Sequence, residues 1–409
     1  MEEEERAQKK HHVHNIKYNI DELIKIRHEF HKYPELQFKE FETQKRIKQF
    51  LLKKGIPQES FKPCATTGYT IDIFGKAEPK NIKKLIALRA EMDALEMPEH
   101  NHHLSYRSTN NAQHACGHDG HMATLLGFIC KFLEIQDKVP SNRGVRILFQ
   151  PSEEGPQSGA LQMIKEGCLD QVDECYGYHN WPTHPVGYLL VKEGAQMAAV
   201  SDIEIKFIGK GGHGSKPECA IDPVQMSVDF HLKFRKLMNE TFKDRKCLST
   251  FPLLKGGTRV NVIASEATIG GTLRSLENDI PDLYKEEIIK ILDEIKEEYP
   301  GSDYDLKFTG KRFDQLDNTP KETNIIKNLG KEYFGEKRVG EFDTIPVYAS
   351  EDFSFYLRKV PGVFFFLGSG KEFDDTMVHD NKYDFNDDLI DIGSDFFMNI
   401  VKNRLELEL

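Results

Sequence analysis

The sequence predicts an α/β protein in which one α/β domain is split by an inserted α+β domain. Near-continuous apolar strands alternate with helical stripes in residues 17–196, and the same style returns in 311–409. This pattern is typical of a mixed, mostly parallel sheet with helices on both faces. Between them, residues 197–310 follow the order β-α-β-β-α-β, which indicates a ferredoxin-like α+β domain.

Hydrophobic spacing predicts the elements of the split domain in order. The first are two helices, 21–33 and 39–54, and the second ends at Gly55, a residue type that suits a helix C-terminus. Short apolar runs then predict strands, and a 3.6-residue period predicts helices. The expected strands are 85–88, 145–149, 172–178 and 363–367, and the expected helices are 122–133 and 159–166.

In the inserted domain, apolar and polar residues alternate over 203–207, which indicates a sheet with one face in water. We find no internal repeat. The remaining expected elements are a helix at 222–237, strands at 248–254 and 259–273, a helix at 281–298 and a strand at 304–308.

Composition excludes several classes of protein. The chain has 409 residues and a net charge of −11, which argues against a general nucleic-acid binder. Membrane association is not expected either, because no run approaches the roughly 18 apolar residues of a membrane span. The seven scattered cysteines suit free thiols, and the N-terminus lacks a secretory signal, so we expect a cytoplasmic protein. Residues 1–16 are charged throughout and predict a flexible tail.

The densest chemical cluster is HACGHDGH, residues 114–121, just before a helical stripe. Cysteine and histidine are strong ligands for zinc-like ions, and the tight loop places Cys116 and His118 on the same side of the chain. Asp119 also suits a helix N-cap. The alternative is that these polar groups only cap a helix and that a core histidine is hydrogen-bonded.

Two adjacent acids, Glu153 and Glu154, follow the strand expected at 145–149. Ligands of doubly wound sheets lie beyond the carboxyl ends of the strands. A metal would stabilise one carboxylate there, and a raised pKa would suit the other to general-base catalysis. Two solvated loop acids are the alternative.

Other strand ends lead to the same edge of the predicted sheet. The strand at 172–178 runs into His179, and the strand at 85–88 runs out into Glu91 and Asp93. This convergence carries more weight than any single motif. His379, beyond the strand at 363–367, would be unremarkable by itself.

The inserted domain contains a glycine-rich turn around His213. It lacks the spacing of a phosphate loop, and its glycines would leave His213 exposed. A plain hairpin turn is the alternative. Asn261 and Arg274, at either end of a strand pair, are equally ambiguous from their position.

At this point the chain closely resembles the dinuclear-metal aminoacylase and carboxypeptidase family. The match is to its branch of N-acyl-amino-acid amidohydrolases, hippurate hydrolases and auxin-conjugate (indoleacetyl-amino acid) hydrolases. The similar segments span residues 28–388 in the family's order. They are HEFHKYPELQFKE, LRAEMDAL, HACGHDGHMA, FQPSEEG, YHNWP, GKGGHGSKP, TRVNVIASEATIGGTLR, SEDFSFYL and VHDNKYDFND.

The resemblance implies a catalytic, metal-binding domain at 17–196 and 311–409 and a dimerisation or lid domain at 197–310. It implies two divalent ions, zinc, manganese or cobalt, with the thiolate as a bridge and Glu153 as the general base. The implied ligands are Cys116, His118, Glu154, His179 and His379.

The resemblance further implies that His213 reaches the site of a second subunit and donates to the developing oxyanion, so a homodimer is expected. Asn261 and Arg274 are similar to residues that hold the substrate carboxylate. Three departures from the family affect the pocket lining: Glu218 after Pro217, Asp380 and Asn381 after His379, and alanine at 264.

The leading hypothesis is a metal-dependent amidohydrolase that cleaves N-acyl, N-aroyl or indoleacetyl L-amino acids, small molecules, into a carboxylic acid and a free amino acid. A dipeptidase or carboxypeptidase of the same fold is the first alternative. A non-catalytic scaffold relative is the second, although the retained Glu153 and the full ligand set argue against it.

Overall fold

The computed structural model describes residues 18–75, 81–371 and 376–408, which form two compact units. The first unit comprises the described residues up to Gly194 together with Asn318–Ile345 and the described part of 355–409. The second comprises Ala195–Asp317 and Pro346–Ser354. The tail predicted at 1–16 lies outside the described residues.

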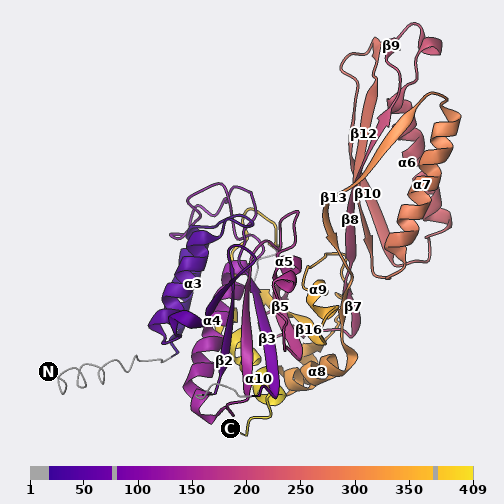
Figure 1. Ribbon diagram of the computed structural model, residues 1–409. Coiled ribbons are helices and arrows are strands. Elements are labelled where there is room, and N and C mark those ends of the chain that lie inside the picture. The colour runs from indigo at the N-terminus through magenta and orange to yellow at the C-terminus, as the bar shows by residue number, and fades with distance from the viewer. Residues whose placement is uncertain (1–17, 76–80, 372–375, 409) are drawn as a thin grey trace, which may run out of the picture. The chain divides into compact units, whose positions relative to one another are not determined.

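An eight-stranded mixed sheet forms the centre of the first unit, in the order β1-β2-β4-β3-β5-β16-β6-β15 (Figure 1). The neighbours β4, β3, β5 and β16 run parallel to one another, whereas β1, β2 and β4 are joined by antiparallel pairs. The strands are β1 (Phe61–Cys64), β2 (Gly68–Phe74), β3 (Lys84–Glu91), β4 (Arg143–Gln150), β5 (Glu174–Pro185), β6 (Leu189–Leu190), β15 (Val339–Gly340) and β16 (Gly362–Gly370).

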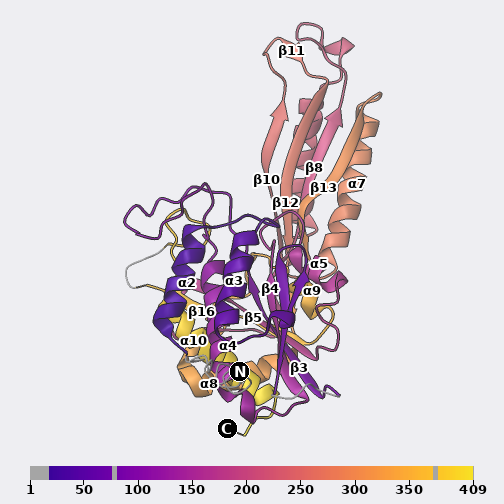
Figure 2. The same ribbon diagram turned by 60° about the vertical axis from the view of Figure 1, so that its left-hand side comes forward.

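Helices cover this sheet (Figures 1 and 2), and apolar side chains of the helices and strands form one core. Leu88, Tyr178 and Phe365, from three of the parallel strands, belong to one core cluster with apolar residues of α2, α3, α4 and α10. The helices of this unit are α2 (Ile20–Lys32), α3 (Phe41–Lys53), α4 (His118–Ile135), α5 (Gly159–Lys165), α8 (Pro320–Phe334), α9 (Ser354–Leu357) and α10 (Asp388–Arg404), of which α9 begins at the last residue of the second unit.

The second unit has the expected β-α-β-β-α-β order, and its antiparallel sheet runs β10-β12-β8-β13. One core cluster holds Phe207 of the sheet together with Phe230 and Tyr284 of the two helices. The elements are β8 (Ala199–Ile208), α6 (Pro223–Glu240), β10 (Cys247–Gly256), β12 (Glu266–Ser275), α7 (Ile280–Glu298) and β13 (Asp303–Phe313). The predicted fold class is confirmed.

Two predicted strands are wrong. The strand expected at 172–178 does not end before His179 but continues through it to Pro185 as β5. Residues 259–273 were expected to form a single strand, but they form β11 (Val262–Ile263) and the greater part of β12. The two are separate because β11 pairs with β9 (Gly212–His213) and not with the four-stranded sheet. The Ser265 carbonyl accepts a hydrogen bond from the Gly209 amide at the break.

Residues 346–354 pack with the second unit because the Val347 amide donates to the Gln196 carbonyl and the Ala198 amide donates to the Val347 carbonyl. The chain passes between the units at β7 (Gly194–Met197) and β14 (Leu316–Asn318). No helix among the described residues is long and apolar enough to cross a membrane. All seven cysteines are free thiols, as expected.

We predict that Gly362→Ala destabilises the first unit. A Cβ there would lie 1.8 Å from the Cys175 carbonyl oxygen, so the pairing of β16 with β5 would have to shift. The cost should be about 2 kcal/mol or more in the free energy of unfolding. Gly340→Ala, in β15 of the same sheet, is the control, because its Cβ would meet only Phe342 at 3.6 Å. Equal urea midpoints for the two variants would contradict this prediction.

Candidate metal centre

The loop that leads into α4 carries two of the predicted ligands. Gly117 lies between Cys116 and His118 with φ +88°, in the left-handed region. A Cβ at this position would lie 2.3 Å from the Asn180 Oδ1 atom, so the turn requires glycine for both its backbone and its space. The loop therefore places a thiol and an imidazole side by side at the start of a buried helix.

The Cys116 sulfur is the centre of the cluster. The Nε2 atoms of His179 and His379 each lie 3.2 Å from it. This is close to the separation of a sulfur and a nitrogen ligand on one tetrahedral zinc ion, about 3.5 Å. The His379 Nε2 atom also lies 3.0 Å from the Glu154 carboxylate.

Two groups of side chains that could each hold an ion share this sulfur. In each group, the ligand atoms lie within 4.8 Å of one another. The structure thus brings together all five side chains expected as ligands. One group is Cys116, His118 and His179, and the other is Cys116, Glu154 and His379.

The histidine rings are oriented as metal ligands require. The His118 Nδ1 atom lies 2.9 Å from the Asp93 carbonyl oxygen, which can only accept, so Nδ1 carries the proton. The His118 Nε2 atom is buried and has no hydrogen-bond partner among the described residues. His179 likewise uses Nδ1 to donate to the Asn180 carbonyl, at 2.8 Å. Because a buried lone pair without a partner is costly, a cation fits this site.

The charges of the cluster also favour a cation. Burial and the neighbouring Glu154 raise the pKa of the Cys116 thiol, so a bridging thiolate needs positive charge beside it. Burial lowers the pKa of His179 to about 3, which keeps this ring neutral and able to coordinate. Hydrogen bonds to Cys116 and Glu154 raise the pKa of His379 to about 10, so a bound ion would replace the proton of this ring.

Glu153 lies beside the same cluster. Its carboxylate, that of Glu154 and the His118 ring have ligand atoms within 4.8 Å of one another, and Glu153 is only 5% exposed. The backbone amides of Glu153 and Glu154 donate to the two Asp93 carboxylate oxygens, at 3.0 and 2.9 Å. A buried acid is therefore held next to the candidate ions without being needed in either group around Cys116.

Glu91 and Asp93, which the sequence marked as ligand-type residues, have partners of their own here, although Glu91 also lies with His118 and His121 in a further group that could hold an ion. Asp93 orients His118 and the Glu153–Glu154 turn. Glu91 forms a buried ion pair with Arg89 and lies 2.8 Å from the His121 Nδ1 atom. The two acids at the end of β3 predicted that polar side chains gather at this edge of the sheet. The sequence alone cannot distinguish an acid that binds a metal from an acid that orients a ligand.

The N-cap predicted for Asp119 is wrong, because the residue lies inside α4, whose N-cap is Gly117. Its buried carboxylate accepts from Arg27 Nη1 at 3.3 Å and His31 Nδ1 at 2.9 Å. The His31 Nε2 atom lies 3.1 Å from Glu99. Sequence reasoning missed this network, although Arg27 and His31 lie four residues apart on the buried side of α2, an unusual place for charge.

The second unit holds the other predicted site residues. His213 is exposed on β9, and its Nδ1 accepts from the Ser215 amide at 3.2 Å and lies 2.8 Å from the Ser215 hydroxyl. The Asn261 carbonyl accepts from the Gly214 amide, so the two segments lie together. Arg274 is at the opposite end of β12 from the pair of β9 and β11 and donates to the Tyr348 carbonyl at 2.7 Å.

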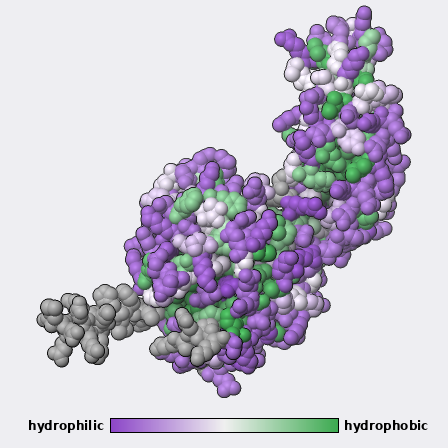
Figure 3. Space-filling model, viewed as in Figure 1, coloured by the Kyte–Doolittle hydropathy of each residue, from purple (hydrophilic) through white to green (hydrophobic). Residues whose placement is uncertain are grey.

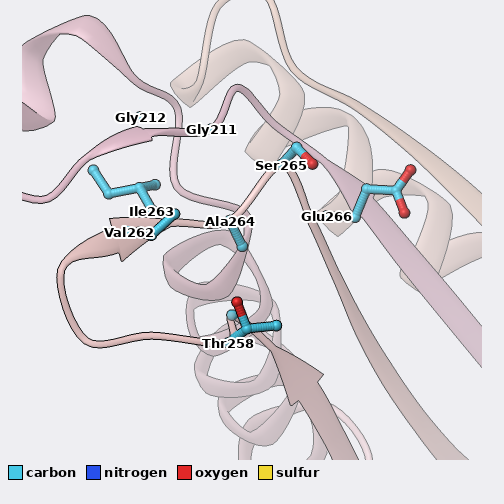
Figure 4. Close-up of a pocket in the computed structure, with 9 residues that line it drawn as sticks. Gly211, Gly212, Thr258, Val262, Ile263, Ala264, Ser265 and Glu266 are labelled. Carbon is cyan, nitrogen blue, oxygen red and sulfur yellow. The ribbon is translucent and has the colours of Figure 1, made fainter.

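A hollow of about 590 Å³ lies between β9, β11 and the start of β12 (Figure 4). Its only ionisable lining residue is Glu266, which pairs with Lys206 at 2.7 Å. Backbone and small side chains such as Thr258 and Ala264 form much of the remaining wall. The hollow offers neither an acid–base pair nor a ligand set, so the chemistry belongs to the cluster in the first unit.

Comparison with known proteins agrees with this geometry. Residues 87–403 match the family described as Peptidase family M20/M25/M40. A hippurate hydrolase of Campylobacter jejuni is 33% identical over 94% of this chain and 97% of its own length. Thermostable carboxypeptidase 1 of Saccharolobus solfataricus is 32% identical over 91% of this chain and 93% of its own length.

Among solved structures, a Bacillus subtilis protein described as a dinuclear metal binding peptidase superposes with a TM-score of 0.76. It is 26% identical, and the match covers 95% of this chain and 99% of that one. The family expected from the sequence motifs is thereby confirmed.

The buried network around Asp119 predicts a loss of stability at alkaline pH. Burial alone would lower the pKa of His31, but hydrogen bonds to Asp119 and Glu99 raise it from 6.5 to about 9. Charged His31 therefore contributes stability that is fully present below pH 6.5 and is lost as pH rises through about 9. The contribution is on the order of 3 kcal/mol.

Urea unfolding of the wild type should show this decline between pH 6.5 and 10. The variant His31→Gln should be less stable at neutral pH and should lose less on going to pH 10. An equal pH dependence for the two proteins would show that His31 is not the titrating group.

Proposed function

The chain belongs to peptidase family M20/M25/M40, a family of amide-bond hydrolases, and we propose that it releases free L-amino acids from N-acyl, N-aroyl or indoleacetyl conjugates. The observation that carries the proposal is the gathering of two possible ligand groups around Cys116 with a buried, separate carboxylate, Glu153, beside them. Ligands alone would suit storage of an ion, whereas ligands with an adjacent base suit hydrolysis.

The side chains that would hold two divalent ions in this mechanism are Cys116, His118, Glu154, His179 and His379. Bound ions would lower the pKa of a water molecule and polarise the scissile carbonyl. Glu153 would take the proton of the attacking water and pass it to the nitrogen of the leaving amine. Zinc, manganese and cobalt all suit a mixed set of sulfur, nitrogen and oxygen ligands.

The second unit would complete the reaction. We assign to His213 a hydrogen bond to the developing oxyanion, made across the interface of a homodimer. Asn261, which lies beside the His213 segment, and Arg274, at the opposite end of β12, would bind the substrate carboxylate from different subunits. The planar guanidinium suits this group. Exposure of His213, and the occupation of its Nδ1 by Ser215, support a role for its other nitrogen toward a ligand.

Two relatives favour different substrates. The similarity to a hippurate hydrolase supports an N-aroyl amino acid, in which the amino group is blocked. The similarity to a carboxypeptidase supports the second candidate, a peptidase that removes a C-terminal residue. Steady-state rates on acylated and unacylated dipeptides would separate them. A cytoplasmic location stays a prediction.

We predict that Glu153→Gln retains both ions and loses hydrolysis. Glutamine keeps the size of the side chain but cannot accept the proton, so kcat should fall about 10²–10⁴-fold. The measurements are metal content per chain and amino-acid release from a panel that includes hippurate and indoleacetyl conjugates. Zinc, manganese or cobalt is supplied, and a chelator should stop release.

The control for this variant is Glu59→Gln, which changes an exposed glutamate of the same unit. Its rate should equal that of the wild type. Hydrolysis by Glu153→Gln at the wild-type rate would overturn the assigned base. A wild type with no metal and no turnover would favour the scaffold.

The proposed homodimer has a suitable surface on the second unit. β10 is an edge strand of its sheet, and Leu254 on it is 53% exposed. Val228 and Leu232, one turn apart on α6, are also exposed. Hydrophilic residues cover most of the visible surface, and hydrophobic residues are exposed over the sheet of this unit (Figure 3). Edge strands and apolar surface are typical of pairing with a second chain.

We predict that Leu232→Glu and Leu254→Glu each shift the protein from dimer to monomer, because each would bury a charge at the interface. Sedimentation velocity measures the change. Leu161→Glu, at a leucine of the first unit that is 39% exposed, should stay dimeric. A monomeric wild type, or dimeric Leu232 and Leu254 variants, would contradict this interface.

A further inference from the structure

Three consecutive backbone amides at the candidate site each donate to a buried carboxylate. The amides of Glu153 and Glu154 use Asp93, and the preceding amide, that of Ser152, donates to Glu40 Oε1 at 3.0 Å. Glu40 comes from the start of α3, 112 residues away in the chain. Two acids from distant segments thus accept hydrogen bonds from the backbone of one short turn.

Glu40 is itself held in place. It is fully buried, and its second oxygen, Oε2, accepts a hydrogen bond from the Thr67 hydroxyl at 2.5 Å. Because both of its oxygens have partners, the carboxyl group cannot rotate away from Ser152 without losing a second bond. Burial of an acid costs free energy unless the acid is hydrogen-bonded, and these two hydrogen bonds offset that cost for Glu40.

The turn needs such support. Ser152 has φ +51°, in the left-handed region, and it is fully buried. A residue other than glycine costs about 1–3 kcal/mol in a sparsely populated conformation of this kind. The Ser152 hydroxyl donates to the Gln157 carbonyl at 2.7 Å, which anchors the far side of the turn. The bond to Glu40 anchors the side that leads directly into Glu153.

We propose that Glu40 is a positioning residue, which fixes the Ser152 turn so that Glu153 and Glu154 meet the ions and the substrate. This inference rests on the proposed roles of those two acids. Glu40 does not touch the reacting atoms and acts only through the backbone of Ser152. Its removal should therefore weaken ion binding through Glu154 and slow the proton transfer of Glu153, with little effect on substrate binding.

Burial, and then the charge of Asp93, raise the pKa of Glu40 to about 7. Near neutral pH the group is thus partly protonated, and glutamine is a close replacement. The glutamine carbonyl oxygen can accept from Ser152, and its amide can donate to the Thr67 oxygen. Alanine can do neither. A positioning role predicts rescue by glutamine and none by alanine.

The experiment compares Glu40→Gln and Glu40→Ala with the wild type by two readouts. Cobalt titration of the metal-free protein, followed by thiolate-to-cobalt absorption, gives an affinity that is independent of catalysis. Steady-state hydrolysis of hippurate gives kcat and KM. Loss of a group that supports a metal ligand typically costs 10–100-fold in metal affinity or activity. We expect that loss in cobalt affinity and kcat for Glu40→Ala, with KM within about threefold.

Glu40→Gln should stay within about threefold of the wild type in both readouts. The matched control is Glu35→Ala. Glu35 lies in the same segment and accepts from the amides of Glu42 and Thr43 at the start of α3. Glu35→Ala should lower stability and leave cobalt affinity unchanged. An equal loss of cobalt affinity in Glu35→Ala and Glu40→Ala would overturn the proposal, as would wild-type affinity and kcat in Glu40→Ala.

If Glu40→Ala does not fold, Glu40→Asp decides the question, because it keeps the charge but shortens the reach to Ser152. Reduced cobalt affinity would support the proposal, and wild-type affinity would overturn it. A wild type that binds cobalt but hydrolyses nothing would contradict the proposed function, while the cobalt titration would still test Glu40. A wild type that binds no cobalt would overturn both.

Discussion

The parallel register of β4, β3, β5 and β16 is the constraint on which the candidate site depends. Glu91 lies opposite Gln150 at the ends of β3 and β4, and Arg89 lies opposite Gly177, so His179 is level with these ends although β5 continues to Pro185. The segments that follow β3 and β4 deliver Asp93, Glu153 and Glu154 at that edge, and β5 delivers His179 directly. A shift of one residue would turn each side chain to the opposite face, so the hydrophobic core fixes the site as well as the fold.

Several buried charges in the first unit form ion pairs near the cluster. Arg27 and His31 face Asp119, and Arg89 faces Glu91. Such pairs rarely add net stability, but removal of one partner is costly because the other charge stays buried. Cys116 differs from these groups, since burial and Glu154 both oppose its ionisation. A bound cation would stabilise the Cys116 thiolate. The surrounding ion pairs would then determine where that cation binds.

The sequence predicted many of the elements, although not β1, β2, α8 or α10, and its family resemblance implied the residues that meet at Cys116. It did not predict the contacts that orient them. Long periodic segments such as α4 and the run at 363–367 carry their own signal, because one face or both must be buried. Residues 259–273 were predicted as one strand because their apolar pattern continues across Ser265. The strand is interrupted there because β11 pairs with β9, which the local sequence does not indicate. Glu40 gave no local signal, since its partner lies 112 residues away. The spacing of Arg27 and His31 on α2 was a signal, but it could not identify Asp119, 88 residues from His31.

Left-handed backbone marks all three turns that carry the proposed ligands and base. Gly117 has φ +88°, Ser152 +51° and His379 +67°. Glycine bears the first at little cost, but the other two are strained. Each strained residue is tied to a distant segment: the Ser152 amide donates to Glu40, and the His379 amide donates to the Ala115 carbonyl at 2.8 Å. The second bond joins the last ligand to the loop that holds Cys116. Contacts with distant segments stabilise the strained backbone at Ser152 and His379. We therefore expect the positions of the ligands to depend on the folding of the whole unit.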